Sequence, residues 1–259
     1  MFKPHKELGQ NFLTDRNVAK DMVEALDIQN GDEIVEIGPG HGVLTGFLAE
    51  KASSLGKNVF LKIHAVELDA RLYQELKTFY SENEKIEVIK DNILDWLPGF
   101  STDKNLKIIG SVPYYITSPI IHKIIKMPAV PQGVVLLVQK EVAEKIKNNA
   151  PDSSYMSSFV QTFFDVKYLG KVPSKKFNPE PKVDGGIIKM VKKEDANLDL
   201  VFIRKYEGFL HKAYSNPRKM LNKVFKKEEL EKGNINPSLR AQNLNAEEWL
   251  NFYKKINEI

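Results

Sequence analysis

The sequence predicts an α/β fold in which a doubly wound, mostly parallel sheet is followed by a small all-helical domain. Short apolar segments of strand length alternate with helical segments through the first half of the chain. Such alternation is typical of a parallel sheet covered by helices. After residue 192 the strand pattern stops and only helical patterns continue. We therefore expect two domains, at residues 1–192 and 193–259.

The composition is that of a folded protein without disulfides. The chain has 259 residues, of which 42% are hydrophobic, so there is enough material for a sizeable core. It contains no cysteine, which excludes disulfides and thiolate metal sites and fits a reducing compartment. Its start lacks the apolar core of a signal peptide, and no apolar run approaches the ~18 residues of a membrane span. We expect a soluble, cytoplasmic protein with no bound metal and no membrane partner.

The first helix is expected directly after Thr14 and Asp15, whose side chains can cap it. Apolar residues at helical spacing carry it to about Ile28. The segment before it, Leu8–Leu13, has too much apolar content for a free tail. We expect that segment to pack against the rest of the domain.

Five strand-like segments follow, and helices separate most of them. A glycine-rich turn at residues 38–42 joins the first strand to a helix, which is the opening of a nucleotide-binding βαβ unit. The strands are expected at residues 33–37, 59–66, 86–90, 106–110 and 133–139, and the intervening helices at residues 43–51, 70–80 and 116–126.

The last part of the sheet differs in character from the first. Two strand-like segments, residues 165–172 and 183–191, flank a proline-rich link at residues 177–181. Two strands joined in this way can run antiparallel, and we place an antiparallel strand at the far edge of the sheet. In the C-terminal domain we expect helices near residues 200–214, 218–225 and 246–256.

Basic residues are concentrated in one C-terminal stretch. The net charge is only +4, but residues 204–227 contain eight basic residues and one acid, Glu207. Such a stretch can be a solvated helix face, or it can contact a phosphate backbone. The composition alone leaves both possibilities open.

The glycine turn has features of a cofactor site. Glycine lets the backbone turn tightly and approach a ligand closely. Gly38, Gly40 and Gly42 have the spacing G-x-G-x-G, which differs from the dehydrogenase pattern G-x-G-x-x-G. Glu36 precedes Gly38 by two residues, and a carboxylate there suits a positively charged ligand such as S-adenosylmethionine better than a diphosphate.

Acidic residues close the next two strands. Glu67 lies where doubly wound folds place the acid that holds ribose hydroxyls. Asp91 follows the third strand, where a carboxylate can accept a hydrogen bond from an adenine amino group. Either residue could have a simpler role, Glu67 on the surface and Asp91 as a helix cap. Ligands in such sheets bind outside the carboxyl ends of the strands, so both acids are expected near one crevice.

The turn after the fourth strand reads Ser111-Val112-Pro113-Tyr114 and lies at the same edge of the sheet. Proline stiffens the turn, and its missing N–H leaves nearby carbonyls free to accept from a ligand. The face of Tyr114 could stack on a base, an interaction of about 1–3 kcal/mol in nucleic-acid sites. Taken alone, the turn is also compatible with an ordinary structural role.

These motifs together resemble the rRNA adenine N6-dimethyltransferase family, in particular its bacterial small-subunit branch. A looser match at residues 218–222 and 240–241 resembles the helical C-terminal domain of that branch, and favours it over the large-subunit resistance methylases. The matching stretches are Leu8–Leu13, Glu36–Thr45, Val66–Asp69, Asp91–Asn92, Val112–Tyr115, Gln139–Val142 and Phe177–Asp184.

The resemblance implies a Rossmann-like class I methyltransferase domain that uses S-adenosylmethionine. The implied reaction is N6,N6-dimethylation of two adjacent adenines in the 3′-terminal hairpin loop of small-subunit rRNA during ribosome biogenesis. The implied partners are that rRNA and the immature small subunit, with the protein as a monomer. The resemblance assigns cofactor contacts to Asn11, Leu13, Glu36, Gly38, Gly40, Glu67, Asp91, Asn92 and Ser111, catalysis to Ser111, Val112, Pro113, Tyr114 and Phe177, and RNA contacts to Arg218, Lys219 and Lys223.

Ser111 departs from the family pattern, which reads Asn-Leu-Pro-Tyr at this turn. The family asparagine accepts a hydrogen bond from the target amine. A serine hydroxyl can also accept one, but it reaches less far. Ser111 therefore leaves one alternative to the dimethyltransferase, an assembly factor with weak or no catalysis. A large-subunit rRNA resistance methylase is a separate and less favoured alternative.

Overall fold

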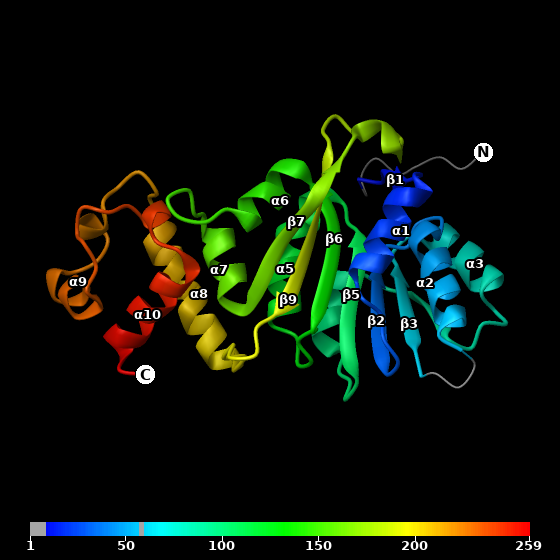
Figure 1. Ribbon diagram of the computed structural model, residues 1–259, viewed down its shortest axis with the longest axis horizontal. Helices are drawn as coiled ribbons and strands as arrows, with labels where there is room; N and C mark the ends of the chain where they lie inside the picture. The colour runs from blue at the N-terminus through cyan, green and yellow to red at the C-terminus, as the bar shows by residue number, and fades with distance from the viewer. Residues whose placement is uncertain (1–8, 57–59) are drawn as a thin grey trace. The chain divides into compact units, whose positions relative to one another are not determined.

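The computed structural model describes residues 9–56 and 60–259, and the chain forms two compact units (Figure 1). Unit 1 comprises residues 1–143 and 167–192, and unit 2 comprises residues 144–166 and 193–259. The chain crosses between units at residue 192, where we expected a boundary, but residues 144–166 were expected in the first domain. They belong to unit 2 because their aromatic side chains pack on its helices: the Tyr155 ring stacks on His211 at 4.3 Å, and Phe163 contacts Tyr206.

Unit 1 is built on a seven-stranded sheet, in the order β4-β3-β2-β5-β6-β9-β7. Neighbouring strands from β4 through β6 are parallel, and β9 is antiparallel to β6. The mostly parallel sheet is therefore confirmed. The chain order reverses between β2 and β5, and doubly wound sheets bind ligands at such a point. The strands are β2 (Asp32–Ile37), β3 (Lys62–Glu67), β4 (Ile86–Lys90), β5 (Asn105–Ser111), β6 (Gly133–Gln139), β7 (Phe164–Val172) and β9 (Gly185–Lys192).

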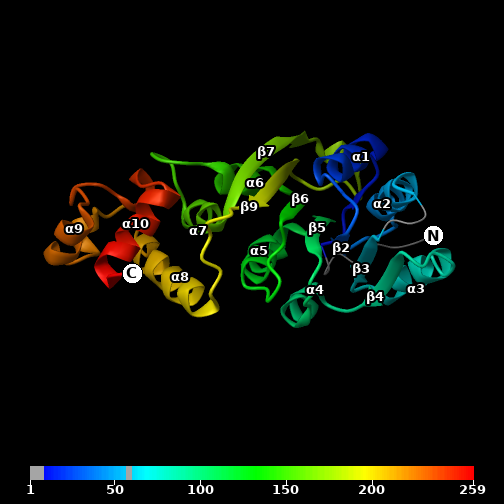
Figure 2. The same cartoon turned by 60° about the horizontal axis from the view of Figure 1, so that its bottom comes forward.

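Helices cover both faces of the sheet, with α1 and α2 on one face and α4 and α5 on the other (Figure 2). Asp15 caps α1 as expected, because its side chain accepts hydrogen bonds from the backbone of Asn17 and Val18. Asp69 caps α3 in the same way. The helices with residues in unit 1 are α1 (Arg16–Ala25), α2 (Val43–Ser54), α3 (Ala70–Phe79), α4 (Ile93–Trp96), α5 (Thr117–Ile125) and α6 (Lys140–Lys147), which ends in unit 2.

The segment before α1 packs down as predicted, through a two-stranded sheet of β1 (Phe12–Leu13) and β8 (Phe177–Asn178). Leu13 is opposite Phe177 in this antiparallel pair and is buried. Residue 8, at the start of that segment, lies outside the described residues, as does Val59, the predicted start of the second strand. The described part of that strand begins at Lys62.

Unit 2 is helical and has an aromatic core. The Phe209 ring lies 5.2 to 5.7 Å from the rings of Phe225, Trp249, Phe252 and Tyr253. Among the described residues of the whole chain, no helix is long and apolar enough to cross a membrane. The helices of this unit are α7 (Tyr155–Phe163), α8 (Leu200–Tyr214), α9 (Lys227–Gly233) and α10 (Ala246–Asn257).

The prediction of a helix at residues 218–225 is wrong. The segment has a single 3₁₀ turn, Leu221–Lys223. Its amides bond across to another segment instead of along a helix: the Leu221 N–H donates to the Leu239 carbonyl at 2.7 Å, and the Asn222 N–H donates to the Pro237 carbonyl. The helices α4, α6, α7 and α9 were not predicted, and three of them are no longer than eight residues.

Candidate cofactor and substrate site

A cavity lies at the carboxyl ends of β2 to β5, at the edge of the sheet where the sequence predicts a site. Residues 9–12 form part of its wall, and the turn after β5 forms another part. The empty space between its wall residues is about 850 Å³, with the open solvent at its mouth included. A single cavity therefore contacts both predicted halves of the site, the cofactor half and the target half.

Most of the predicted site residues line this cavity. Leu13 lies outside its wall but lines an adjoining cavity, which shares Asn11, Gly38 and Ser111 with the first. Glu36 lines neither of the two. The predicted residues in the wall of the first cavity are Asn11, Gly38, Gly40, Glu67, Asp91, Asn92, Ser111, Val112, Pro113, Tyr114 and Phe177.

The glycine turn requires glycine for two physical reasons. Gly38 and Gly40 have φ angles of 61° and 60°, a left-handed backbone conformation that residues other than glycine rarely adopt. A Cβ on Gly40 would lie 2.8 Å from the Phe12 ring, so the packing of residue 12 also excludes a larger residue. A Cβ on Gly38 would meet nothing within 4 Å, which leaves its backbone open to a ligand.

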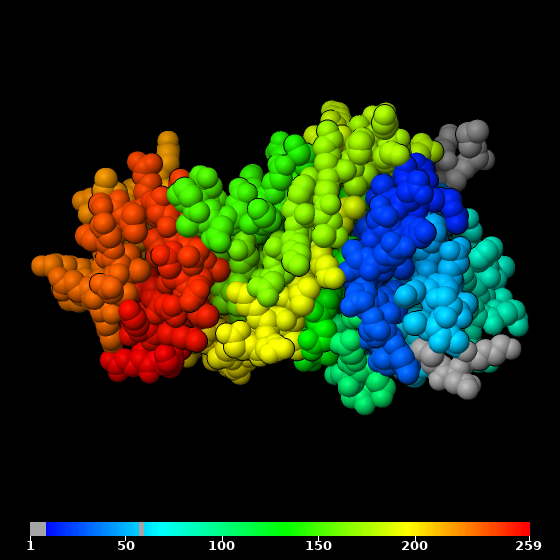
Figure 3. Space-filling model, in the orientation of Figure 1, coloured from blue at the N-terminus to red at the C-terminus, as the bar shows by residue number. Residues whose placement is uncertain are grey.

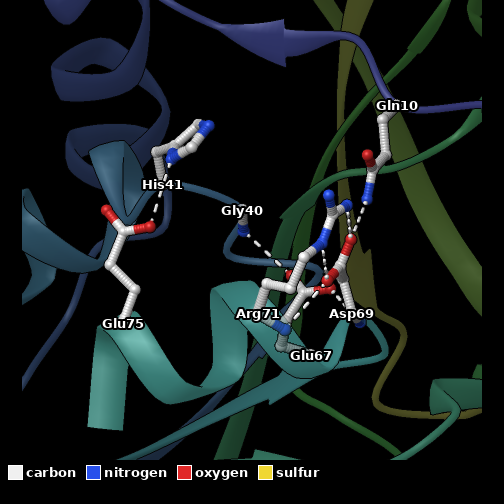
Figure 4. A network of polar contacts seen from close by, with 7 residues as sticks. All are labelled: Gln10, Gly40, His41, Glu67, Asp69, Arg71 and Glu75. Carbon is white, nitrogen blue, oxygen red and sulfur yellow. Dashed lines mark hydrogen bonds and ion pairs between the residues drawn. The ribbon is translucent and has the colours of Figure 1, made fainter. Parts of the chain in front are cut away.

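Glu67 joins the glycine turn to the end of β3. One carboxylate oxygen accepts from the Gly40 N–H at 3.0 Å, and the other accepts from the Asp69 N–H at 2.8 Å (Figure 4). Burial raises the pKa of Glu67. A carboxylate has about four acceptor positions, so both oxygens can still accept from a ligand.

Glu36 lies behind the turn and does not line the cavity, unlike its neighbour Ile37. Its side chain is fully buried, and neither oxygen has a hydrogen-bond partner of good geometry among the described residues. Its pKa is raised to about 8, chiefly by burial and also by the charge of Glu67, with hydrogen bonding to nearby Thr45 acting in the opposite direction. Successive strand side chains point to opposite faces, so residue 36 faces away from the cavity that residue 37 lines. This geometry does not support the expected direct contact of Glu36 with the cofactor.

The turn after β5 presents free polar groups to the cavity. The Ser111 hydroxyl has no hydrogen-bond partner within the described part of the chain. Val112 is buried, and its N–H donates to the Leu137 carbonyl at 3.1 Å, which holds the turn against β6. The Tyr114 hydroxyl is buried without a partner among the described residues, and burial raises its pKa to about 12. Tyr114 is therefore neutral at physiological pH.

Sequence reasoning missed a polar network just after the end of β3, where Asp69 follows Glu67 by two residues (Figure 4). Asp69 accepts from the Gln10 side-chain amide at 3.0 Å and from the Nε and Nη2 atoms of Arg71 at 3.0 and 2.6 Å. The hydrogen bond from Arg71 is the main cause that holds the pKa of Asp69 far below its usual range. The position of Asp69, directly before a helix and two residues after Glu67, was a signal available in the sequence.

The predicted RNA-contacting residues lie on the surface of unit 2. Arg218, Lys219 and Lys223 are exposed, and none of them has an ion-pair partner among the described residues. The orange segment that contains them forms part of the outer surface of the unit (Figure 3). By contrast, the Lys212 ammonium lies 3.3 Å from the Glu229 carboxylate and 4.5 Å from the centre of the Phe225 ring.

Comparison with known proteins identifies the family. The model of the family described as "Ribosomal RNA adenine dimethylase" matches residues 1–258. The chain is 36% identical to the "Ribosomal RNA small subunit methyltransferase A" of Mycoplasmopsis pulmonis, over 97% of this chain and 98% of the relative. It is 33% identical to the protein of the same name from Sulfurihydrogenibium sp., over 97% of this chain and 95% of the relative.

Solved structures share the fold. A dimethyladenosine transferase from Plasmodium falciparum superposes with a TM-score of 0.81 at 24% identity, covering 95% of this chain and 98% of the other. The 23S rRNA methyltransferase ErmE superposes with a TM-score of 0.74 at 22% identity, covering 95% of this chain and 100% of the other. The class I methyltransferase fold is thus confirmed. Since the family model spans nearly the whole chain and the relatives exceed 30% identity over nearly their whole length, this protein belongs to the ribosomal RNA adenine dimethylase family.

Proposed function

We propose that this protein transfers methyl groups from S-adenosylmethionine to two adjacent adenines in the 3′-terminal hairpin loop of small-subunit rRNA, and that it methylates each N6 amine twice. One observation carries the proposal: a single cavity is lined both by the strand-end acids suited to the cofactor and by the turn Ser111–Tyr114 suited to the target. The relatives named for the small subunit support that choice of rRNA. We further propose that it acts in the cytoplasm as a monomer on the immature small subunit.

The residues of the cavity fit S-adenosylmethionine. The cofactor supplies an electrophilic methyl group on a sulfonium centre. We assign the ribose hydroxyls to Glu67, whose oxygens retain acceptor capacity, and the adenine to Asp91 and Asn92 at the end of β4. Gly38, where a Cβ would meet nothing within 4 Å, and Asn11 would hold the methionine portion.

Ser111 would orient the target amine. The lone pair of an adenine N6 amine is delocalised into the ring, so the amine is a poor nucleophile unless it is held in a reactive geometry. The Ser111 hydroxyl can accept a hydrogen bond from one N–H of the amine, and a backbone carbonyl near Pro113 can accept a hydrogen bond from the other N–H. Such alignment is a proximity effect and needs no strong base, because the proton leaves after charge has developed on nitrogen.

Tyr114 and Phe177 would hold the adenine itself. An enzyme that modifies a base must take that base out of its stack. Both aromatic residues line the cavity, and Phe177 is 6% exposed, so its ring is held by packing before any base enters. Stacking on such rings stabilises an unstacked base by about 1–3 kcal/mol.

Methyl transfer to immature small subunits tests the proposal. Purified protein with labelled S-adenosylmethionine should produce N6,N6-dimethyladenosine, detected by mass spectrometry of the rRNA nucleosides. Glu67→Ala should abolish the product, because the ribose contact and the support of the Gly40 turn are lost together. If wild-type protein yields no dimethyladenosine from these subunits, the proposed function is wrong.

Ser111 supports a second candidate function, an assembly factor that binds the small subunit with little catalysis. Replacement Ser111→Asn distinguishes the two. If wild-type protein binds subunits tightly without turnover and Ser111→Asn creates activity, the assembly factor is the better description. The large-subunit methylase would be recognised by its choice of substrate, since the likeness to ErmE at 22% identity concerns the fold alone.

A further inference from the structure

Residues 9–14, here called the strap, contact the part of the cavity wall assigned to the target base. Leu13 is paired with Phe177 in the small sheet of β1 and β8. The N–H and the hydroxyl of Thr14 both donate to the Lys176 carbonyl at 2.9 Å. At the start of the strap, a Cβ on Gly9 would lie 3.0 Å from the Tyr115 ring, so the two are in close contact.

The strap also contacts the part of the wall assigned to the cofactor. Phe12 packs against Gly40 of the glycine turn, and its ring lies edge-on to His41 at 4.7 Å. Two residues before Phe12, the Gln10 side-chain amide donates to a carboxylate oxygen of Asp69 at 3.0 Å (Figure 4). The strap therefore links the wall beside the cofactor to the wall beside the target.

Asp69 is a rigid acceptor for this hydrogen bond. Its side chain is 4% exposed, and one oxygen accepts from the Arg71 N–H at 2.9 Å, which caps α3. The Arg71 guanidinium donates one hydrogen bond to each oxygen of the Asp69 carboxylate. A hydrogen bond to an ionised acceptor is roughly twice as strong as one between neutral groups. Gln10 thus ties the strap to a charged group that the surrounding structure already fixes.

We propose that Gln10 is a positioning residue whose hydrogen bond to Asp69 latches the strap over the bound cofactor. Because the strap is paired with β8, the same latch also positions Phe177 for the target adenine. In this proposal the strap opens before the cofactor leaves, so breaking the latch should speed release and loosen Phe177 together. This inference rests on the proposed function, because it takes the cavity to hold S-adenosylmethionine and an adenine.

The replacement Gln10→Met tests the latch, because methionine has a similar length and cannot donate a hydrogen bond. The matched control is Gln74→Met: Gln74 is an exposed glutamine on α3 whose amide, among the described residues, bonds within its own helix to Thr78. We expect Gln10→Met to dissociate S-adenosylmethionine about tenfold faster, as for the loss of one charge-assisted hydrogen bond. Gln74→Met should match wild type. Equal dissociation rates in all three proteins would overturn the latch.

A double-mutant cycle separates the latch from general loosening of the fold. Asp69→Asn can still cap α3 but removes the charged acceptor, and it should also speed dissociation. If the two residues act through one hydrogen bond, the double replacement is no faster than the faster single one. Rate increases that multiply would show that the two residues act independently and would contradict the proposal.

Two further readouts complete the test. Gln10→Met should raise KM for S-adenosylmethionine and also lower kcat, because Phe177 is loosened; an unchanged kcat would overturn the link to Phe177. If wild-type protein does not bind S-adenosylmethionine, the proposed function fails. The hydrogen bond between Gln10 and Asp69 can then still be tested in the protein without cofactor, by amide hydrogen exchange. Backbone amides of residues 12 and 13 should exchange hydrogen faster in Gln10→Met than in Gln74→Met, and equal rates would refute the latch.

Discussion

The edge of the sheet in unit 1 and the core of unit 2 differ in whether their buried polar groups have hydrogen-bond partners. At the sheet edge, Glu36 and the Tyr114 hydroxyl are buried without hydrogen-bond partners of good geometry among the described residues. In unit 2, all of which is described, every buried side-chain nitrogen and oxygen has a partner. For example, the Tyr214 hydroxyl lies 2.8 Å from the Ser158 hydroxyl and accepts from the Trp249 indole at 3.2 Å.

The difference shows where each unit uses its polar groups. A buried polar group without a partner costs about 1–3 kcal/mol, so a fold retains one chiefly where binding or chemistry requires it. In unit 1 this cost falls at Tyr114, which lines the cavity, and at Glu36, which lies behind the glycine turn. Unit 2 satisfies its interior completely and leaves unpaired charges only on its surface, which suits a part of the molecule that recognises a partner by surface contact.

The largest expected effect is in the core of unit 2. Trp249→Ala should lower the free energy of unfolding by about 3–5 kcal/mol, because it leaves a cavity among aromatic rings and deprives Tyr214 of a donor. The control is the other tryptophan, Trp96, which is half-buried and stacks on Phe100 at 4.6 Å. Trp96→Ala should cost about 1 kcal/mol. Urea unfolding measures both, and similar losses for the two variants would show that unit 2 lacks the tight core described here.

The next effect concerns Glu36, whose pKa is raised from 4.5 to about 8 in the folded protein. Between these two values the folded state binds more protons than the unfolded state, so stability falls as pH rises from about 4.5 to about 8. Glu36→Gln carries no charge to bury. It should remove this pH dependence and stabilise the protein at pH 8 by on the order of 3 kcal/mol.

Thermal unfolding of wild type and Glu36→Gln across this pH range measures how the stability of each protein depends on pH. Glu33→Gln serves as a control, because Glu33 is on the same strand and has a partner, His64, at 2.6 Å. A Glu36→Gln variant that is less stable than wild type at pH 8 would show that the carboxylate is stabilised by its surroundings, contrary to the contrast between the units.

The smallest effects are expected on the surface of unit 2. Arg218→Ala, Lys219→Ala and Lys223→Ala should each weaken binding to small-subunit rRNA a few-fold, and each should reduce the salt dependence of binding by about one counterion. Lys212→Ala is the control, since Lys212 is already paired with Glu229. Filter binding at several salt concentrations tests this. A larger loss for Lys212→Ala than for the other three would place the RNA contact elsewhere.

Much of the site could be predicted because its signals are local in the chain. Gly38, Glu67, Asp91 and Ser111 each follow a strand that the apolar pattern marks, and parallel strands bring such ends to one edge. Glu36 could not be placed in the same way, because motif spacing does not say which face of the strand it occupies. The latch between Gln10 and Asp69 joins residues 59 positions apart, and no spacing rule predicts such a contact.

The sequence by itself determined the alternation of strands and helices, the glycine turn and the acids at the strand ends, because apolar periodicity and glycine conformation act over a few neighbouring residues. Only the tertiary structure decided three other features. It assigned residues 144–166 to the helical unit, turned residues 218–225 away from a helix, and brought the strap onto β8 and Asp69. Each depends on packing or hydrogen bonds between segments far apart in the chain, and the free energy of such contacts exceeds the local preference of either segment.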